Sequence, residues 1–486
     1  MTAVRVDARY CGDRPSGQPG RVPSRYRAWA ERVAGATPGG RDRTVDALRA
    51  AAIAGVVLGH WLVSATVTDP DRPAALHGAS PLSTLPALAP VSWLFETLGL
   101  FFVAAGYAAA RPREATGHGN VRADGRAVLR WLARPSVVRL GVPVLVLAAV
   151  WLPGLLVLDL AGAPATTRHL VVSLVTHPLW FLVVYLVLAA AAPPLRRLVC
   201  RWGLWSALPA VLAVAAVDAA RGGGLPAWVA PVATPIAWSA PYLFGIALAQ
   251  GRLSRRGGGV LLAGGVAGGA LLLRLGYPAS AVGVPGDHWS NLDPPSLLAL
   301  ALAAAQLGLF LLVRPWLARL LARPAAWAPV AGLNRAALTV YCWHQSALLL
   351  VTFAAVPLGP LPGLLDRPTG SWVVHRLWWL PVFVATLVAL CRLFHRPPSR
   401  SSARPARDGP ARPGAGQESS GRLSRPARDG PARPGAGQES IGPLSGPARD
   451  GPGQESSGRL SGPARDGLAR RGQESSGRLS RTSSSA

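Results

Sequence analysis

Lysine is absent from this chain of 486 residues, so all 50 basic residues are arginine. Cysteine is scarce, and the four that occur, Cys11, Cys200, Cys342 and Cys391, lie far apart and form no CxxC pair. This pattern argues against a disulfide framework and against a metal site, so we expect no bound metal. Helical patterns with a broad polar face are also missing from the apolar part of the chain, which argues against a soluble helical bundle.

Apolar residues are abundant and unevenly placed. They make up 50% of the chain, although the last 90 residues, 397–486, are almost wholly polar. The others gather in blocks of roughly 18 to 25 residues, the length that crosses a bilayer as a helix. The blocks are 45–65, 87–110, 137–158, 170–192, 204–219, 228–249, 259–277, 295–313, 332–357 and 373–395. The sequence therefore predicts an all-α integral membrane protein with about ten transmembrane helices.

The arginines alternate between connections. A net charge of +27 would suggest a nucleic-acid partner in a soluble protein. Here the arginines lie in the tails and in every second short connection, so we expect a lipid bilayer as partner and no nucleic acid. By the positive-inside rule, this alternation predicts an even number of helices and cytoplasmic positions for both termini. We expect a multi-pass protein of the cell membrane.

Polar segments flank the apolar region. Residues 1–44 are rich in Arg and lack the apolar core of a signal peptide, so the first transmembrane helix is expected to be the targeting anchor. In residues 397–486, the unit PARDGPARPGAGQES occurs from Pro405 and again from Pro426. We expect this tail to be disordered. An alternative is contact with anionic lipid, because it holds 15 Arg and 8 acidic residues. The predicted domains are 1–44, 45–396 and 397–486.

Ionisable side chains within a bilayer are costly and are therefore functional candidates. The candidates are Arg49, His60, Glu96, Arg139, His177, His344 and Arg376. Arg49 and His60 are eleven positions apart, so they share one helix face at about 16 Å. Asp46, one turn before Arg49, is positioned to hold its guanidinium. Simpler alternatives are snorkelling for Arg49 and a hydrogen bond between helices for His60.

Further polar residues lie in later blocks. Tyr341 and His344 are one turn apart, so Tyr341 is placed to orient the imidazole. Glu96 either orients a histidine, binds an acceptor or makes a structural hydrogen bond. Arg376 is close to the outer end of its block, where an interfacial position is an equal alternative.

Five segments together resemble the membrane acyltransferase-3 family. Asp46-x-x-Arg49 followed by His60 resembles its first-helix motif, and 100–107 resembles its FFxxSG segment, with Ala105 in place of Ser. The Arg-rich run 134–143, Leu179-Trp180-Phe181-Leu182 and Tyr341-x-x-His344 resemble three further motifs in family order. The resemblance spans 45–396.

The resemblance implies an acyl-CoA-dependent O-acyltransferase. Such an enzyme moves an acyl group, commonly acetyl, from cytoplasmic acyl-CoA to a hydroxyl of a carbohydrate or another envelope or exported acceptor. Acyl-CoA is the donor substrate, and no bound cofactor is implied. The implied roles are His60 as general base, His344 as a second proton-transfer or acceptor-binding residue, Arg49 and Arg139 as donor-binding residues, and Trp180 and Tyr341 as pocket residues. The replacement of Ser by Ala at position 105 puts the usual positioning of the acceptor in question.

Two other classes of protein use similar features. A secondary transporter also buries charged residues, but transporters often contain related halves, and 45–192 shows no resemblance to 204–395. A non-catalytic membrane scaffold would act through its Arg-rich tail.

Overall fold

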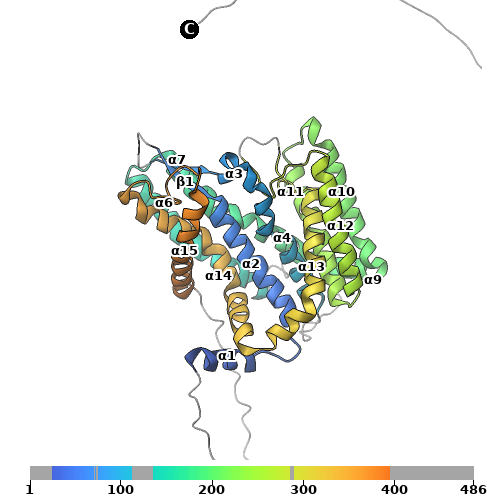
Figure 1. The fold of residues 1–486 in the computed structure, drawn as a ribbon. Coiled ribbons are helices and arrows are strands. Elements are labelled where there is room, and N and C mark those ends of the chain that lie inside the picture. Colours follow the sequence, from blue (N-terminus) through green and yellow to red (C-terminus); the bar gives the residue numbers. More distant parts are fainter. Residues whose placement is uncertain (1–23, 70–71, 73–74, 112–134, 285–288, 395–486) are drawn as a thin grey trace, which may run out of the picture. The chain divides into compact units, whose positions relative to one another are not determined.

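The computed structural model describes residues 24–69, 72, 75–111, 135–284 and 289–394, with the main chain only for 135–139. The predicted disordered tail at 397–486 and the first half of the N-terminal segment lie outside these residues. Almost all of the described chain is helical (Figure 1).

The helices follow one another with short connections. The first half contains α1 (Arg25–Gly35), α2 (Arg43–Val63), α3 (Pro81–Thr84), η1 (Pro86–Leu94), α4 (Leu98–Ala110), α6 (Pro135–Leu160), α7 (Ala165–Thr176), η2 (His177–Leu179) and α8 (Trp180–Ala190). The second half contains α9 (Ala192–Trp202), η3 (Gly203–Ala207), α10 (Leu208–Ala220), η4 (Arg221–Gly223), α11 (Val229–Ala249), α12 (Arg255–Arg274), α13 (Leu297–Leu321), α14 (Pro324–Ala355), η5 (Val356–Leu358) and α15 (Trp372–Phe394). Within the described residues, ten helical segments are long and apolar enough to cross a membrane, which confirms the predicted architecture.

Proline divides two of the predicted helices. The block predicted at 87–110 begins as the 3-10 helix η1, which contains Pro90, and becomes α-helical only at Leu98. The block at 170–192 changes at His177-Pro178 from α7 to η2 and then continues as α8. Proline has no amide hydrogen and its ring crowds the preceding turn, so it breaks the regular helix at both places.

One end of the helices is held by a polar cluster around Asp42, which precedes α2. Its carboxylate accepts hydrogen bonds from Thr44 at the start of α2, Tyr107 in α4 and Arg314 in α13, the last at 2.7 Å. Burial opposes ionisation, but these hydrogen bonds lower the pKa of Asp42 below its ordinary value. The arginine alternation requires these helix ends to lie together, and they do (Figure 1). Which side of the membrane this end faces stays a prediction.

Two apolar cores fill the described part. One joins α4, α8, α11 and α13, and the other joins α2, α7, α14 and α15. Small residues allow close approach in the first core: a Cβ on Gly106 would lie 2.0 Å from the carbonyl oxygen of Tyr242, and one on Gly245 would lie 2.0 Å from that of Val103. Such contacts are typical of helix pairs in membranes, where tight packing replaces the hydrophobic effect.

The opposite end carries a small antiparallel hairpin of β1 (Ala65–Thr68) and β2 (Leu76–Ala79), in which Ala65 pairs with Ala79 and Thr68 with Leu76. The hairpin is tied to its surroundings through its main chain. The amide of Thr68 donates to the carbonyl of Leu365, and the amide of Leu76 donates to Thr167 of α7. The residues that follow α2 are therefore fixed against the loop before α15.

Candidate active site

Two histidines meet where α2 packs against α14. His60 belongs to the last turn of α2 and His344 to the middle of α14. Nδ1 of His60 lies 3.2 Å from Nε2 of His344, and the two ring centroids are 5.0 Å apart in an edge-on arrangement. His344 is completely buried, whereas His60 is partly exposed. The structure thus brings the two predicted histidines into direct contact.

The contacts of this pair determine which nitrogens carry protons. Nδ1 of His344 lies 2.7 Å from the carbonyl oxygen of Tyr341. Because a carbonyl only accepts, Nδ1 holds the proton and the Nε2 of neutral His344 is an acceptor. Nδ1 of His60 faces that acceptor and therefore donates. Consequently Nε2 of His60 is left with a free lone pair, as a general base requires.

Gln345 completes the hydrogen bonding at His60. Its side-chain amide contacts Nδ1 of His60, with Nε2 at 3.0 Å, while its Oε1 is buried without a partner. Amide oxygen and nitrogen are distinguished by the hydrogen bonds around them. Placing the oxygen toward Nδ1 of His60 satisfies both groups, which supports the same tautomer. The sequence signal for Gln345 was its position beside His344 in an apolar block, and sequence reasoning gave it no role.

Tyr341 orients His344 through its main chain. Its carbonyl binds the imidazole, while its hydroxyl donates to the carbonyl of Pro178 in η2. The Tyr341 ring also packs against Phe181 of α8, with centroids 5.3 Å apart. Tyr341 therefore links α14 to the helical break beside the histidine pair.

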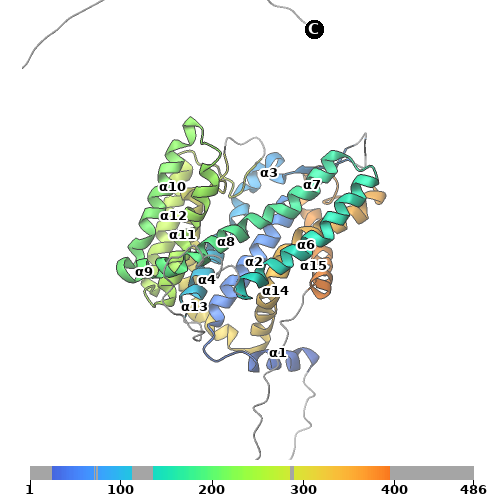
Figure 2. The same cartoon turned by 180° about the vertical axis from the view of Figure 1, so that it is seen from behind.

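The break at η2 adds a third histidine. The ring of His177 lies 6.2 Å from that of His60, and the His177 side chain is exposed. Trp180 begins α8 three residues later and packs edge-on against Phe181. Figure 2 shows α7 and α8 passing on the side of the bundle where α2 and α14 meet. The placement of Trp180 near the site agrees with its predicted position, and its role stays a prediction.

Trp61 and Arg376 support the pair from behind. The indole nitrogen of Trp61 donates to the carbonyl of His344 at 2.9 Å. Arg376 of α15 donates from Nε to the carbonyl of Trp61 at 2.7 Å and from NH2 to that of Ser64 at 2.7 Å. Arg376 has no exposed surface, so the interfacial alternative for it is wrong. Neither supporting role was predicted from the sequence.

Arg49 lies on the face of α2 that carries His60, three turns earlier. Its side chain is partly buried, and its Nε has no hydrogen-bond partner in the described part of the chain. The expectation that Asp46 holds this guanidinium is wrong, because the Asp46 carboxylate pairs with Arg41, at 3.0 Å for NH2. Arg139 belongs to α6, but its side chain lies outside the described residues.

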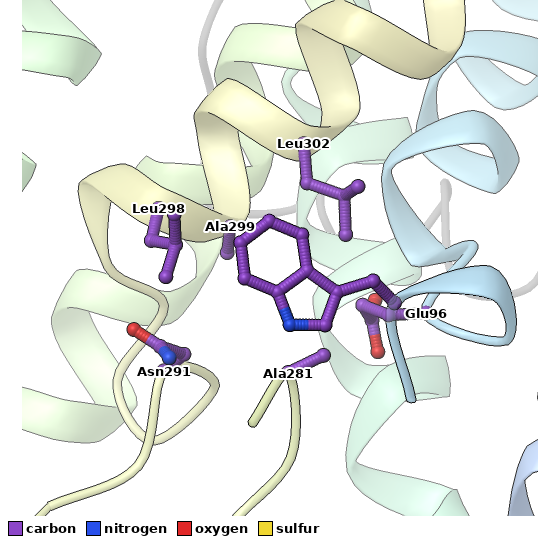
Figure 3. A pocket seen from close by; sticks show the side chains of 7 residues that line it. Glu96, Ala281, Asn291, Leu298, Ala299 and Leu302 are labelled. Carbon is purple, nitrogen blue, oxygen red and sulfur yellow. The ribbon is translucent and has the colours of Figure 1, made fainter. Parts of the chain in front are cut away.

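The structure places Glu96 away from the histidine pair. Its Oε1 accepts from the amide of Leu98 at 3.2 Å. The side chain faces a cavity of about 10 Å³, room for about one water molecule, between η1, α13 and the loop before α13. Figure 3 shows Glu96 and Asn291 on opposite sides of this cavity. Of the predicted alternatives, these contacts agree with a structural hydrogen bond.

The ten spans and the buried histidine pair define a multi-pass membrane protein with a site suited to proton transfer. A family model described as an acyltransferase domain, that of the acyltransferase-3 family, matches residues 42–396. This match covers well over half of the chain, so the protein belongs to the acyltransferase-3 family and is a membrane acyltransferase. No curated protein and no solved structure matches the chain.

Proposed function

We propose that the protein transfers an acyl group, acetyl in the first instance, from cytoplasmic acyl-CoA to a hydroxyl of a carbohydrate or another envelope or exported acceptor, in the cell membrane. The observation that carries this proposal is the histidine pair. The contacts of His344 direct the proton of His60 to Nδ1 and leave Nε2 free to accept one.

The proposed reaction uses this free nitrogen as the base. Nε2 of His60 takes the proton of the acceptor hydroxyl while the hydroxyl oxygen attacks the thioester carbonyl carbon. A carbon–oxygen bond forms, the carbon–sulfur bond breaks, and the proton on His60 passes to the departing thiolate. His344 stabilises the imidazolium that forms in between, because its Nε2 accepts from Nδ1 of His60 throughout.

Arg49 is the proposed contact for the donor phosphates. Its guanidinium is not paired with Asp46, which leaves it available, and guanidinium groups bind phosphate oxygens well. The separation of about 16 Å along α2 between Arg49 and His60 requires a long donor, with its charged end and its reactive end far apart.

Two substitutions test the proposal in protein shown to reach the membrane. His60→Ala should lower acyl transfer by about 10²- to 10⁴-fold, the contribution of a general base. Arg49→Ala should raise KM for acyl-CoA. The matched controls are His169→Ala in α7 and Arg319→Ala in α13, both exposed and outside the site, which should leave both parameters unchanged. Wild-type acylation by His60→Ala would remove the base from the proposal, and an unchanged KM in Arg49→Ala would remove the donor contact.

A further inference from the structure

Arg376 is an unusual residue for the interior of a membrane domain. Its side chain is completely buried, and each of its three nitrogens donates to a main-chain carbonyl. Its guanidinium also lies 5.2 Å from the ring of Trp372 and 4.8 Å from that of Phe383. A buried charge without a role is expensive, so a residue held in this way calls for a specific task.

Two of the three carbonyls belong to the last turn of α2. The final carbonyls of a helix lack partners within the helix and carry its partial negative charge. Arg376 binds those of Trp61 and Ser64, and the amide of Ser64 donates to the carbonyl of His60 at 2.9 Å. The cation of Arg376 therefore closes the helical turn that begins with His60.

The third carbonyl fixes Arg376 itself. It belongs to Gly363, in the loop before α15, at 3.1 Å from NH1. Gly363 has a φ of +74°, and a Cβ there would lie 2.5 Å from the amide nitrogen of Arg376, so only glycine fits this contact without strain. The loop and the side chain of Arg376 are thus locked to each other.

Trp61 transmits this arrangement to His344. Its carbonyl is held by Arg376, and its indole nitrogen binds the carbonyl of His344. The Trp61 ring also packs against Phe383 of α15, with centroids 5.5 Å apart. Both histidines are consequently referred to one anchor, His60 through the last turn of α2 and His344 through the indole of Trp61.

We propose that Arg376 is the positioning residue of the histidine pair, setting the alignment of Nδ1 of His60 with Nε2 of His344 from the opposite side of α2. It touches neither the donor nor the acceptor in this role. The kinetic part of the inference rests on the proposed function, since it assumes that the pair transfers a proton during acylation.

The test compares Arg376→Lys with Arg221→Lys in the full chain in lipid nanodiscs. Arg221 is a matched control, because it is a buried arginine that binds Asp218 and the carbonyl of Pro294, far from the pair in sequence and in contacts. Lysine keeps the charge in both variants but cannot reach several carbonyls at once. Arg376→Lys should lower kcat about 10- to 100-fold, as misplacement of a catalytic group by about 1 Å does, with KM for the donor unchanged. Arg221→Lys should keep wild-type kcat per folded molecule.

A second readout does not depend on turnover. Carbethoxylation of His60 by diethyl pyrocarbonate, mapped by mass spectrometry, should change in rate in Arg376→Lys and stay at the wild-type rate in Arg221→Lys. Absence of acyl transfer in the wild-type protein, with the labelling difference present, would overturn the proposed function and keep the positioning role. Equal labelling in both variants and wild type, or wild-type kcat in folded Arg376→Lys, would overturn the positioning role.

Discussion

His60 and His344 should behave as one unit when they are removed singly and together. The perturbations are His60→Ala, His344→Ala and the double variant. Loss of the base should cost about 10²- to 10⁴-fold in kcat. The His344 substitution removes one hydrogen bond, of 3.2 Å, to a ring that becomes charged during the reaction. Such bonds contribute about 1.5–3 kcal/mol, or about 10- to 100-fold in rate.

The double variant distinguishes a coupled pair from two independent groups. If His344 acts only through His60, its removal has no further effect once His60 is absent, so the double variant should match His60→Ala. Initial rates of thiol release from acyl-CoA, measured with purified protein in nanodiscs and normalised to folded protein, provide the assay. The exposed His169→Ala variant serves as control. A loss in the double variant equal to the product of the two single losses would refute the coupling.

Three other predictions concern stability and the tail. Gly245→Ala should lower the free energy of unfolding by about 1–3 kcal/mol, because its Cβ would lie 2.0 Å from a carbonyl oxygen of α4, whereas Gly264→Ala meets no atom within 4 Å and should be tolerated; thermal unfolding of both compares them. Asp42→Asn should destabilise the protein at neutral pH. Burial works against it, but hydrogen bonds, among them that from Arg314, hold the pKa of Asp42 below 3.8. The stabilisation is therefore present above that pH and lost as the pH falls through the lowered pKa, so melting temperatures of wild type and variant should converge in acid. Deletion of residues 397–486 should leave acyl transfer by purified protein intact, and loss of transfer with normal membrane insertion would instead support the scaffold alternative.

The spans were predictable because the signal for them is local. Length and hydropathy of each block suffice to identify a membrane helix, and the structure finds ten such segments in its described residues. Periodicity also placed Arg49 and His60 on one face of α2 correctly, since the helix contains no break between them.

Contacts between distant segments were not predictable from these patterns. Asp46 has two arginines within reach of one helical turn or a short loop, and sequence spacing favoured Arg49, whereas the turn before α2 brings Arg41 to it. Arg376 was placed near an interface because it lies close to a helix end. Its burial depends on the loop at Gly363 folding back over that end, which hydropathy does not encode.

The histidine pair shows both the reach and the limit of the sequence. His60 and His344 stood out as ionisable residues deep in apolar blocks. Their direct contact arises from the packing of α2 on α14 and from the bond between Trp61 and the His344 carbonyl, 283 positions apart. A pattern within one helix cannot report such a pairing.

The central claim is acyl transfer from acyl-CoA with His60 as the base. Its most direct test supplies acetyl-CoA labelled in the acetyl group to the purified wild-type and His60→Ala proteins in nanodiscs, with an extract of envelope glycans as acceptor, and follows the label by mass spectrometry. The account predicts a labelled, hydroxyl-linked acetyl group on an acceptor with the wild-type protein and about 10²-fold or more slower labelling with His60→Ala. Equal labelling by the two proteins would contradict it.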